Sequence, residues 1–185
     1  MSYYTVRGIV DRSLPVLFFT SLIGIAAGQM LNSKIDTLVS IPALLILIPA
    51  LIKIGGDTGS MLGARLSSAF HMGLGSHIHR NPVVRNSVLA ALIVGITACV
   101  LLSGIVWLMS KIMNIGIGFM PLLKISMIAG SLELLIVFSA TIGIAFASHR
   151  FGIDPDDTVI PLIATLGDLV GVVGIFAALH ILQII

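Results

Sequence analysis

The chain has 185 residues, of which 57% are hydrophobic and only 10% are charged, and its mean hydropathy is +1.15. Soluble domains carry about 25% charged residues, so this composition excludes a soluble domain and indicates a polytopic membrane protein. The net charge is +2, and no basic cluster is interleaved with aromatic residues, so nucleic-acid binding is not expected. Cys99 is the single cysteine, which excludes a disulfide within one chain.

Apolar runs follow a short N-terminal segment, residues 1–13, and a bilayer needs roughly 20 apolar residues per helix. We expect an all-α domain over residues 14–185, with five spans at about 14–31, 38–74, 83–113, 120–148 and 158–183. The second run would be about 55 Å long as one helix. We therefore predict one crossing, broken or extended at Gly55–Gly56, with a tilted or interfacial first part. Two short crossings, and thus six spans, are the alternative.

An odd number of spans places the two termini on opposite sides of the membrane. The N-terminal side would then carry five arginines and the opposite side three lysines: Arg7, Arg12, Arg80, Arg85 and Arg150 against Lys34, Lys111 and Lys124. The positive-inside rule therefore favours a cytoplasmic N-terminus and an outside C-terminus, in the cell membrane.

Three carboxylates, Asp57, Glu133 and Asp168, fall well inside the expected spans. An aspartate at the centre of a membrane helix costs roughly 2.5–3.5 kcal/mol on insertion scales. The structural interpretation is that Asp57 or Glu133 pairs with Arg65, or that Glu133 is a neutral buried carboxyl. We expect the other basic groups in the spans to snorkel, cap or pack against a neighbouring helix rather than bind metal: Lys53, His180 and His71.

Asp168 shares one helical face with small residues, because Ala164, Asp168 and Gly171 follow i, i+4, i+7 spacing. Small residues allow helix backbones to approach closely, and in a pore wall they leave room for a hydrated ion. Pro161 can free a further carbonyl oxygen from the helix ladder. The pattern fits both a packing seam around a buried neutral Asp168 and an ion site.

The run from Gly55 to Asp57 adds a glycine pair beside an acid, which favours exposed backbone carbonyls where protein or water covers them. Oxygen donors dominate both segments, and this favours a hard cation, above all Mg²⁺. We expect Asp168, Ala164 and Asp57 to bind the metal ion. We expect four further residues to line the path or form its helix break: Gly55, Gly56, Thr165 and Gly171.

Two segments carry a family resemblance. GIDPDDTVIPLIATLGDLVGVVGIF, residues 152–176, is similar to a Gly-x-Asp-Pro loop followed by Pro-Leu-x-Ala-Thr-x-x-Asp, and IPALIKIGGDTGSMLGARLSSAFHMG, residues 48–73, is similar to a Gly-Gly-Asn segment followed by an Arg. In both motifs the sequence resembles the membrane domain of the MgtE magnesium-transporter family and of its eukaryotic solute-carrier relatives. The resemblance extends from about residue 14 to residue 185.

The resemblance implies a homodimer whose ion path follows the two-fold axis between the second and fifth spans. In that family the aspartate matching Asp168 holds a hydrated cation, near a carbonyl that matches Ala164. This chain departs from the family at Asp57, which replaces an asparagine, and at Thr141, where bacterial members often have asparagine. Only about 13 residues precede the first span, so gating by large N-terminal cytoplasmic domains is not expected.

The leading hypothesis is therefore divalent-cation transport, with Mg²⁺ as the ion. An H⁺- or Na⁺-coupled exchanger, in which Asp57 and Glu133 carry protons, is one alternative, and an accessory subunit of a larger transporter is another. An intramembrane enzyme is not expected. DTGSMLGAR resembles part of the lipid phosphotransferase motif, but the paired upstream aspartate and the downstream Asp-x-x-x-Asp are missing.

Overall fold

The computed structural model describes residues 5–73, 82–151 and 155–184, and of residues 9, 12 and 155–158 it describes the backbone alone. All regular structure within these ranges is α-helical. The helices are α1 (Val6–Asn32), α2 (Ile35–Ser40), α3 (Pro42–His71), α4 (Pro82–Ile112), α5 (Phe119–Arg150) and α6 (Pro155–Ile181). Five of them, all except the short α2, are long and apolar enough to cross a membrane, which confirms the expected five spans.

The first helix begins earlier than the apolar run suggested, at Val6 rather than near residue 14. Thr5 is its N-cap, and the Thr5 hydroxyl accepts a hydrogen bond of 3.2 Å from the amide of Gly8. A side-chain acceptor at this position satisfies one of the free amides of the first turn. The helix therefore extends through the polar residues that precede its apolar part.

The predicted break at Gly55–Gly56 is wrong, because α3 is helical without interruption from Pro42 to His71. The chain instead breaks at Ile41, between the short α2 and Pro42, the first residue of α3. Proline is well suited to that position because its missing N–H has no partner in the first turn. A break within the membrane would leave backbone groups unsatisfied, and this cost exceeds the roughly 1 kcal/mol by which glycine disfavours a helix.

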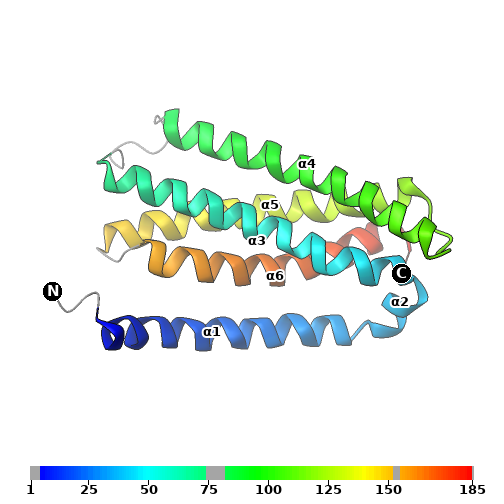
Figure 1. The fold of residues 1–185 in the computed structure, drawn as a ribbon, viewed down its shortest axis with the longest axis horizontal. Helices are drawn as coiled ribbons and strands as arrows, with labels where there is room; N and C mark the ends of the chain where they lie inside the picture. Colours follow the sequence, from blue (N-terminus) through cyan, green and yellow to red (C-terminus); the bar gives the residue numbers. More distant parts are fainter. Residues whose placement is uncertain (1–4, 74–81, 152–154, 185) are drawn as a thin grey trace.

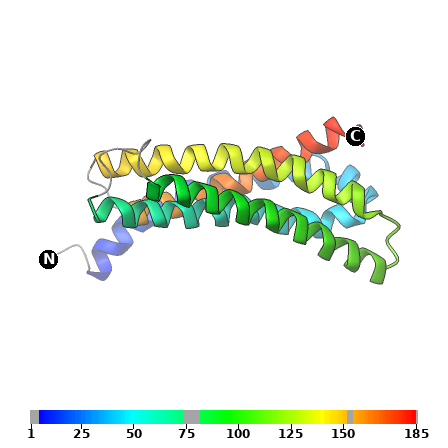
Figure 2. The same ribbon diagram turned by 90° about the horizontal axis from the view of Figure 1, so that it is seen from above.

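The four helices α3, α4, α5 and α6 form a bundle along one common direction, and α1 lies beside it (Figures 1 and 2). The most extensive packing joins α3 to α6 and α5 to α6, whereas α4 packs on α3 and α5. α1 packs against α6. The start of α1 and the end of α6 lie at opposite ends of the molecule (Figure 1). α3 and α6 are therefore central partners, and each also has a side that other helices leave uncovered.

Two clusters of buried apolar side chains hold the bundle together. One surrounds Leu47 and Leu51 of α3, and the other surrounds Leu62 and Leu66. Large apolar side chains also cover much of the outside, among them Phe18, Phe19, Ile93, Leu101 and Leu135. An apolar exterior around a packed apolar interior is what a bilayer requires.

Candidate ion site

An ion pair joins α3 and α6, the two most extensively packed helices, about halfway along α6. The ammonium nitrogen Nζ of Lys53 in α3 lies 2.9 Å from the carboxylate oxygen Oδ1 of Asp168 in α6. Asp168 is about 20 Å from either end of α6 by helical rise, which is the middle of this membrane-length helix. The Lys53 side chain is 54% exposed and that of Asp168 is 29% exposed. The pair therefore opens onto the outer surface of a single chain.

Polar residues continue from this pair along α3. Asp57 is exposed one turn after Lys53, and Ser60 follows at i+7 on the same face. The Ser60 hydroxyl donates a hydrogen bond of 3.4 Å to the carbonyl of Ile160 in α6. We call Lys53, Asp57, Ser60 and Asp168 the polar stripe. It is the part of the described surface where charged groups lie at mid-membrane depth.

Ala164 and Thr165 lie one turn before Asp168 and are partly buried. The Ala164 carbonyl oxygen faces α3, because a Cβ atom added at Gly56 would lie 2.9 Å from it. The Thr165 hydroxyl donates to the carbonyl of Pro161 at 2.9 Å, within its own helix. Thus Ala164 is brought to the α3–α6 contact, and the Thr165 hydroxyl is engaged by the helix itself.

The expected path-lining glycines are buried at helix contacts. A Cβ atom at Gly167 would overlap the backbone of Gly56, and one at Gly171 would lie 2.8 Å from a methyl carbon of Ile52. Gly55 likewise lies directly against the Glu133 side chain of α5. In one chain these glycines form the packing seam that the sequence left open as an alternative. Asp168 at the edge of this seam is partly exposed and paired, not enclosed.

Glu133 is the most buried of the three carboxylates in the spans, with 1% of its surface exposed. It lies between α5 and the glycine pair of α3, and its oxygen Oε1 has no hydrogen-bond partner. Thr141, two turns later in α5, is also buried, and its hydroxyl donates to the carbonyl of Val137 at 2.8 Å. Glu133 thus packs against Gly55 of α3, the helix that also carries Lys53 and Asp57.

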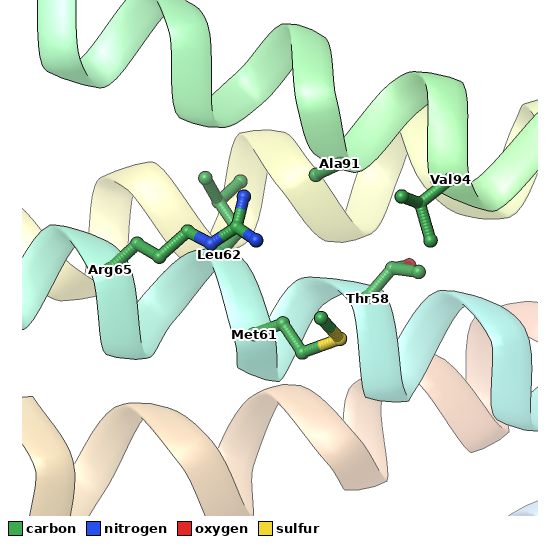
Figure 3. Close-up of a pocket in the computed structure, with 6 residues that line it drawn as sticks. All are labelled: Thr58, Met61, Leu62, Arg65, Ala91 and Val94. Atoms are coloured by element: carbon green, nitrogen blue, oxygen red, sulfur yellow. The ribbon is translucent and has the colours of Figure 1, made fainter.

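Arg65 forms no ion pair with Asp57 or Glu133, so the pairing allowed by the sequence is not found. Arg65 follows Asp57 by eight residues, which is about 12 Å of helical rise, and its side chain is exposed. It lies instead at a small pocket between α3 and α4 (Figure 3). The other residues of this pocket are Thr58, Met61, Leu62, Ala91 and Val94.

Lys53 is the site residue that sequence reasoning missed, since we expected it to snorkel. The available signal was its position one turn before Asp57 on a face that also carries Ser60. We expected His71 to pack against a neighbouring helix, but its side chain is exposed and its Nδ1 lies 3.0 Å from the carbonyl oxygen of Ser67 in its own helix. The sequence His77 to His79 is too short to form a metal site alone and is predicted to belong to a loop, and it lies outside the described residues.

Within the described ranges, no group of three or more His, Cys, Asp or Glu side chains is placed to hold a metal ion. A single chain thus offers one carboxylate in the α3–α6 contact and a second, Asp57, on the same exposed surface. A hydrated Mg²⁺ needs only one or two protein carboxylates, because it retains most of its water. The stripe suits such an ion if a second surface completes the enclosure.

A bundle of membrane-spanning helices with mid-membrane charges on two partner helices defines an integral membrane protein that handles ions or other polar solutes. Residues 48–178, more than two thirds of the chain, match the MgtE family, described as a divalent cation transporter, and the chain belongs to this family. The match includes all of α4 and α5, with most of α3 and α6. No solved structure matches the chain.

Proposed function

We propose that this protein transports Mg²⁺ as a homodimer, with the ion path between the α3 and α6 helices of the two copies. Asp168 holds the hydrated cation, Asp57 adds negative charge to the path, and the Ala164 carbonyl contributes to the same region. The observation that carries this proposal is the polar stripe, whose charged side chains are exposed at mid-membrane depth.

An uncovered stripe would be costly in a bilayer. Each mid-membrane charge costs about 2.5–3.5 kcal/mol by insertion scales, and such residues face a bundle interior or a water-filled cavity in nearly all cases. A second copy of the chain could cover the stripe, because the two-fold symmetry of a dimer brings the same residues of both copies together. Two Asp168 carboxylates would then flank one hydrated divalent ion.

The test is cation uptake into proteoliposomes that contain only this protein, with Mg²⁺, Mn²⁺, Ca²⁺ and Na⁺ offered in turn. Asp168→Asn keeps the size of the side chain and removes its charge, so we expect Mg²⁺ flux to fall to the level of empty liposomes. Asp36→Asn, in the short helix α2 outside the stripe, is the matched control and should transport normally. Full Mg²⁺ uptake by folded, dimeric Asp168→Asn protein would refute the proposal, and absence of wild-type flux would favour an accessory subunit.

Coupled exchange is a second candidate, which the burial of Glu133 favours. A buried carboxyl with an unpartnered oxygen, beside the helix that carries the stripe, has the character of a proton carrier. Mg²⁺-dependent proton flux in liposomes loaded with a pH-sensitive dye would support it, and Glu133→Gln should abolish that flux. If no protons move, or if they move independently of Mg²⁺, coupled exchange is rejected and the transport is uncoupled.

We also propose the orientation with the N-terminus in the cytoplasm. Among the described residues, arginines gather at the end of the bundle where α1 begins, and lysines at the other: Arg7, Arg85 and Arg150 against Lys34, Lys111 and Lys124. Lys111 lies 4.8 Å from the centre of the Trp107 ring, an arrangement suited to a membrane interface. Protease access to a tag after residue 185, from outside intact cells, tests this topology.

A further inference from the structure

The ammonium group of Lys53 takes up the place on Asp168 that a transported cation needs. Its nitrogen lies 2.9 Å from Oδ1, at the distance of a charge-assisted hydrogen bond. We infer that Lys53 is a tethered cation that competes with the transported ion for Asp168 and sets which ions can bind there. This inference rests on the proposed transport function and concerns the selectivity of the same site.

Lys53 is able to leave Asp168 without becoming an isolated charge. Asp57 lies four residues later on the same face of α3, and residues at i and i+4 are neighbours on a helix surface. Among the described residues, no ion pair forms with Asp57. The lysine side chain is a flexible four-carbon stem with a compact charge, so its ammonium can turn from one aspartate to the other. Asp57 would therefore receive Lys53 when an ion occupies Asp168.

The exchange favours divalent over monovalent ions on charge alone. When Na⁺ displaces the ammonium from Asp168, one unit charge replaces another, so the carboxylate gains little Coulomb energy. When Mg²⁺ displaces it, two unit charges replace one, and the attraction to Asp168 at a given distance doubles. To bind at Asp168, an ion must therefore be attracted to the carboxylate more strongly than the Lys53 ammonium is, and a monovalent ion does not meet this condition.

Lys53 also limits how tightly a divalent ion is held. The three charged residues of the stripe carry a net charge of −1 per chain, and a two-fold dimer would carry −2, which one Mg²⁺ neutralises. Without the two lysines, the same dimer would present −4. A conducting site must bind its ion weakly enough to release it. The lysine therefore serves both selectivity and release.

The experiment measures Mg²⁺ binding to the full chain in nanodiscs by isothermal titration, with and without 150 mM Na⁺ or K⁺ in roughly the physiological range. We compare the wild type with Lys53→Met, which removes the charge and keeps the length, and with Lys53→Arg, which keeps the charge. We expect Lys53→Met to bind Mg²⁺ up to about fivefold more tightly and to lose that gain to Na⁺ or K⁺, as expected for release of one partly exposed ion pair. Lys53→Arg should behave like the wild type.

Unchanged or weaker Mg²⁺ binding by Lys53→Met would overturn the inference and make the pair a structural link between α3 and α6. A second measurement uses Asp57→Asn, in which the displaced ammonium of Lys53 has no second aspartate to pair with. Mg²⁺ should increase the rate at which an amine-acylating reagent modifies Lys53, detected by mass spectrometry, and should leave the rate at Lys124 unchanged. A Lys53 rate that does not respond to Mg²⁺ also overturns the inference.

The proposed function fails by a different result. Wild-type Mg²⁺ binding by Asp168→Asn would show that Asp168 is not the ion ligand. If Asp168→Asn loses binding and Lys53→Met does not gain it, the ligand assignment stands and the competition by Lys53 is rejected.

Discussion

Gly56 of α3 and Gly167 of α6 meet backbone to backbone, so closely that a Cβ atom at Gly167 would overlap the main chain of Gly56. This contact lies one residue before Asp168 in α6 and three residues after Lys53 in α3. Because neither backbone can move away without separating the helices, the glycine contact fixes the distance across which Lys53 and Asp168 meet. The packing seam and the candidate ion site are thus one structural unit.

Gly167→Ala should therefore destabilise the fold. A methyl group has no space against a helix backbone, and overpacking of this kind costs about 1–3 kcal/mol. Thermal unfolding of the purified protein in detergent should show a melting temperature lower by several degrees.

Gly104→Ala is the matched control, because Gly104 lies inside α4 and a Cβ atom there meets nothing within 4 Å. It should be neutral or should stabilise the protein, since alanine is about 1 kcal/mol better than glycine in a helix. Equal melting temperatures for the two variants would contradict the close contact between α3 and α6.

Gly55→Ala should be destabilising for a different reason, because the added methyl group would overlap the side chain of Glu133. Removing that side chain should relieve the clash. In a double-mutant cycle with Glu133→Ala, we expect a coupling free energy of at least about 1 kcal/mol, measured by chemical or thermal unfolding. Additive effects of the two substitutions would place Glu133 away from Gly55.

Asp57→Asn should weaken the apparent affinity for Mg²⁺ without abolishing uptake. Asp57 is exposed on the polar stripe and adds one negative charge near the proposed path. Loss of one unit charge acting through water on a divalent ion should reduce the affinity about three- to tenfold. Uptake at a series of Mg²⁺ concentrations measures this, and the difference should shrink as ionic strength rises. An unaltered concentration dependence would remove Asp57 from the path.

Disulfide crosslinking tests the proposed two-fold interface. Ala64 follows Ser60 by four residues on the face of the polar stripe, so Ala64→Cys should give crosslinked dimers in membranes under mild oxidation. Leu101→Cys, on the exposed side of α4, should remain monomeric on a non-reducing gel. Both are made in a Cys99→Ala background, although Cys99 itself is buried. Crosslinking through Leu101→Cys alone would place the interface on α4.

Much of the fold could be predicted from the sequence because each span is an apolar run of a length set by the bilayer. The residues at which the helices begin and end were harder to predict from the sequence. α1 begins at Val6 because Thr5 caps it, and α3 begins at Pro42 because the chain turns at Ile41. The glycine pair misled the prediction, since Gly55 and Gly56 permit close packing rather than a break. The role of a glycine depends on which residues of the neighbouring helix face it, and the order of residues along the chain does not show this.

The sequence by itself determined the five membrane helices, the family motifs and the placement of Asp57, Glu133 and Asp168 within apolar runs, because these follow from local composition and spacing. Only the tertiary structure decided the partners of these carboxylates. Asp168 forms an ion pair with Lys53, which is 115 residues away in sequence. Glu133 is enclosed against Gly55, and Arg65 pairs with neither Asp57 nor Glu133. The physical reason is that charge pairing in a helical bundle is set by which helix faces come into contact, and that contact is decided by the fit of small and large side chains across the whole interface.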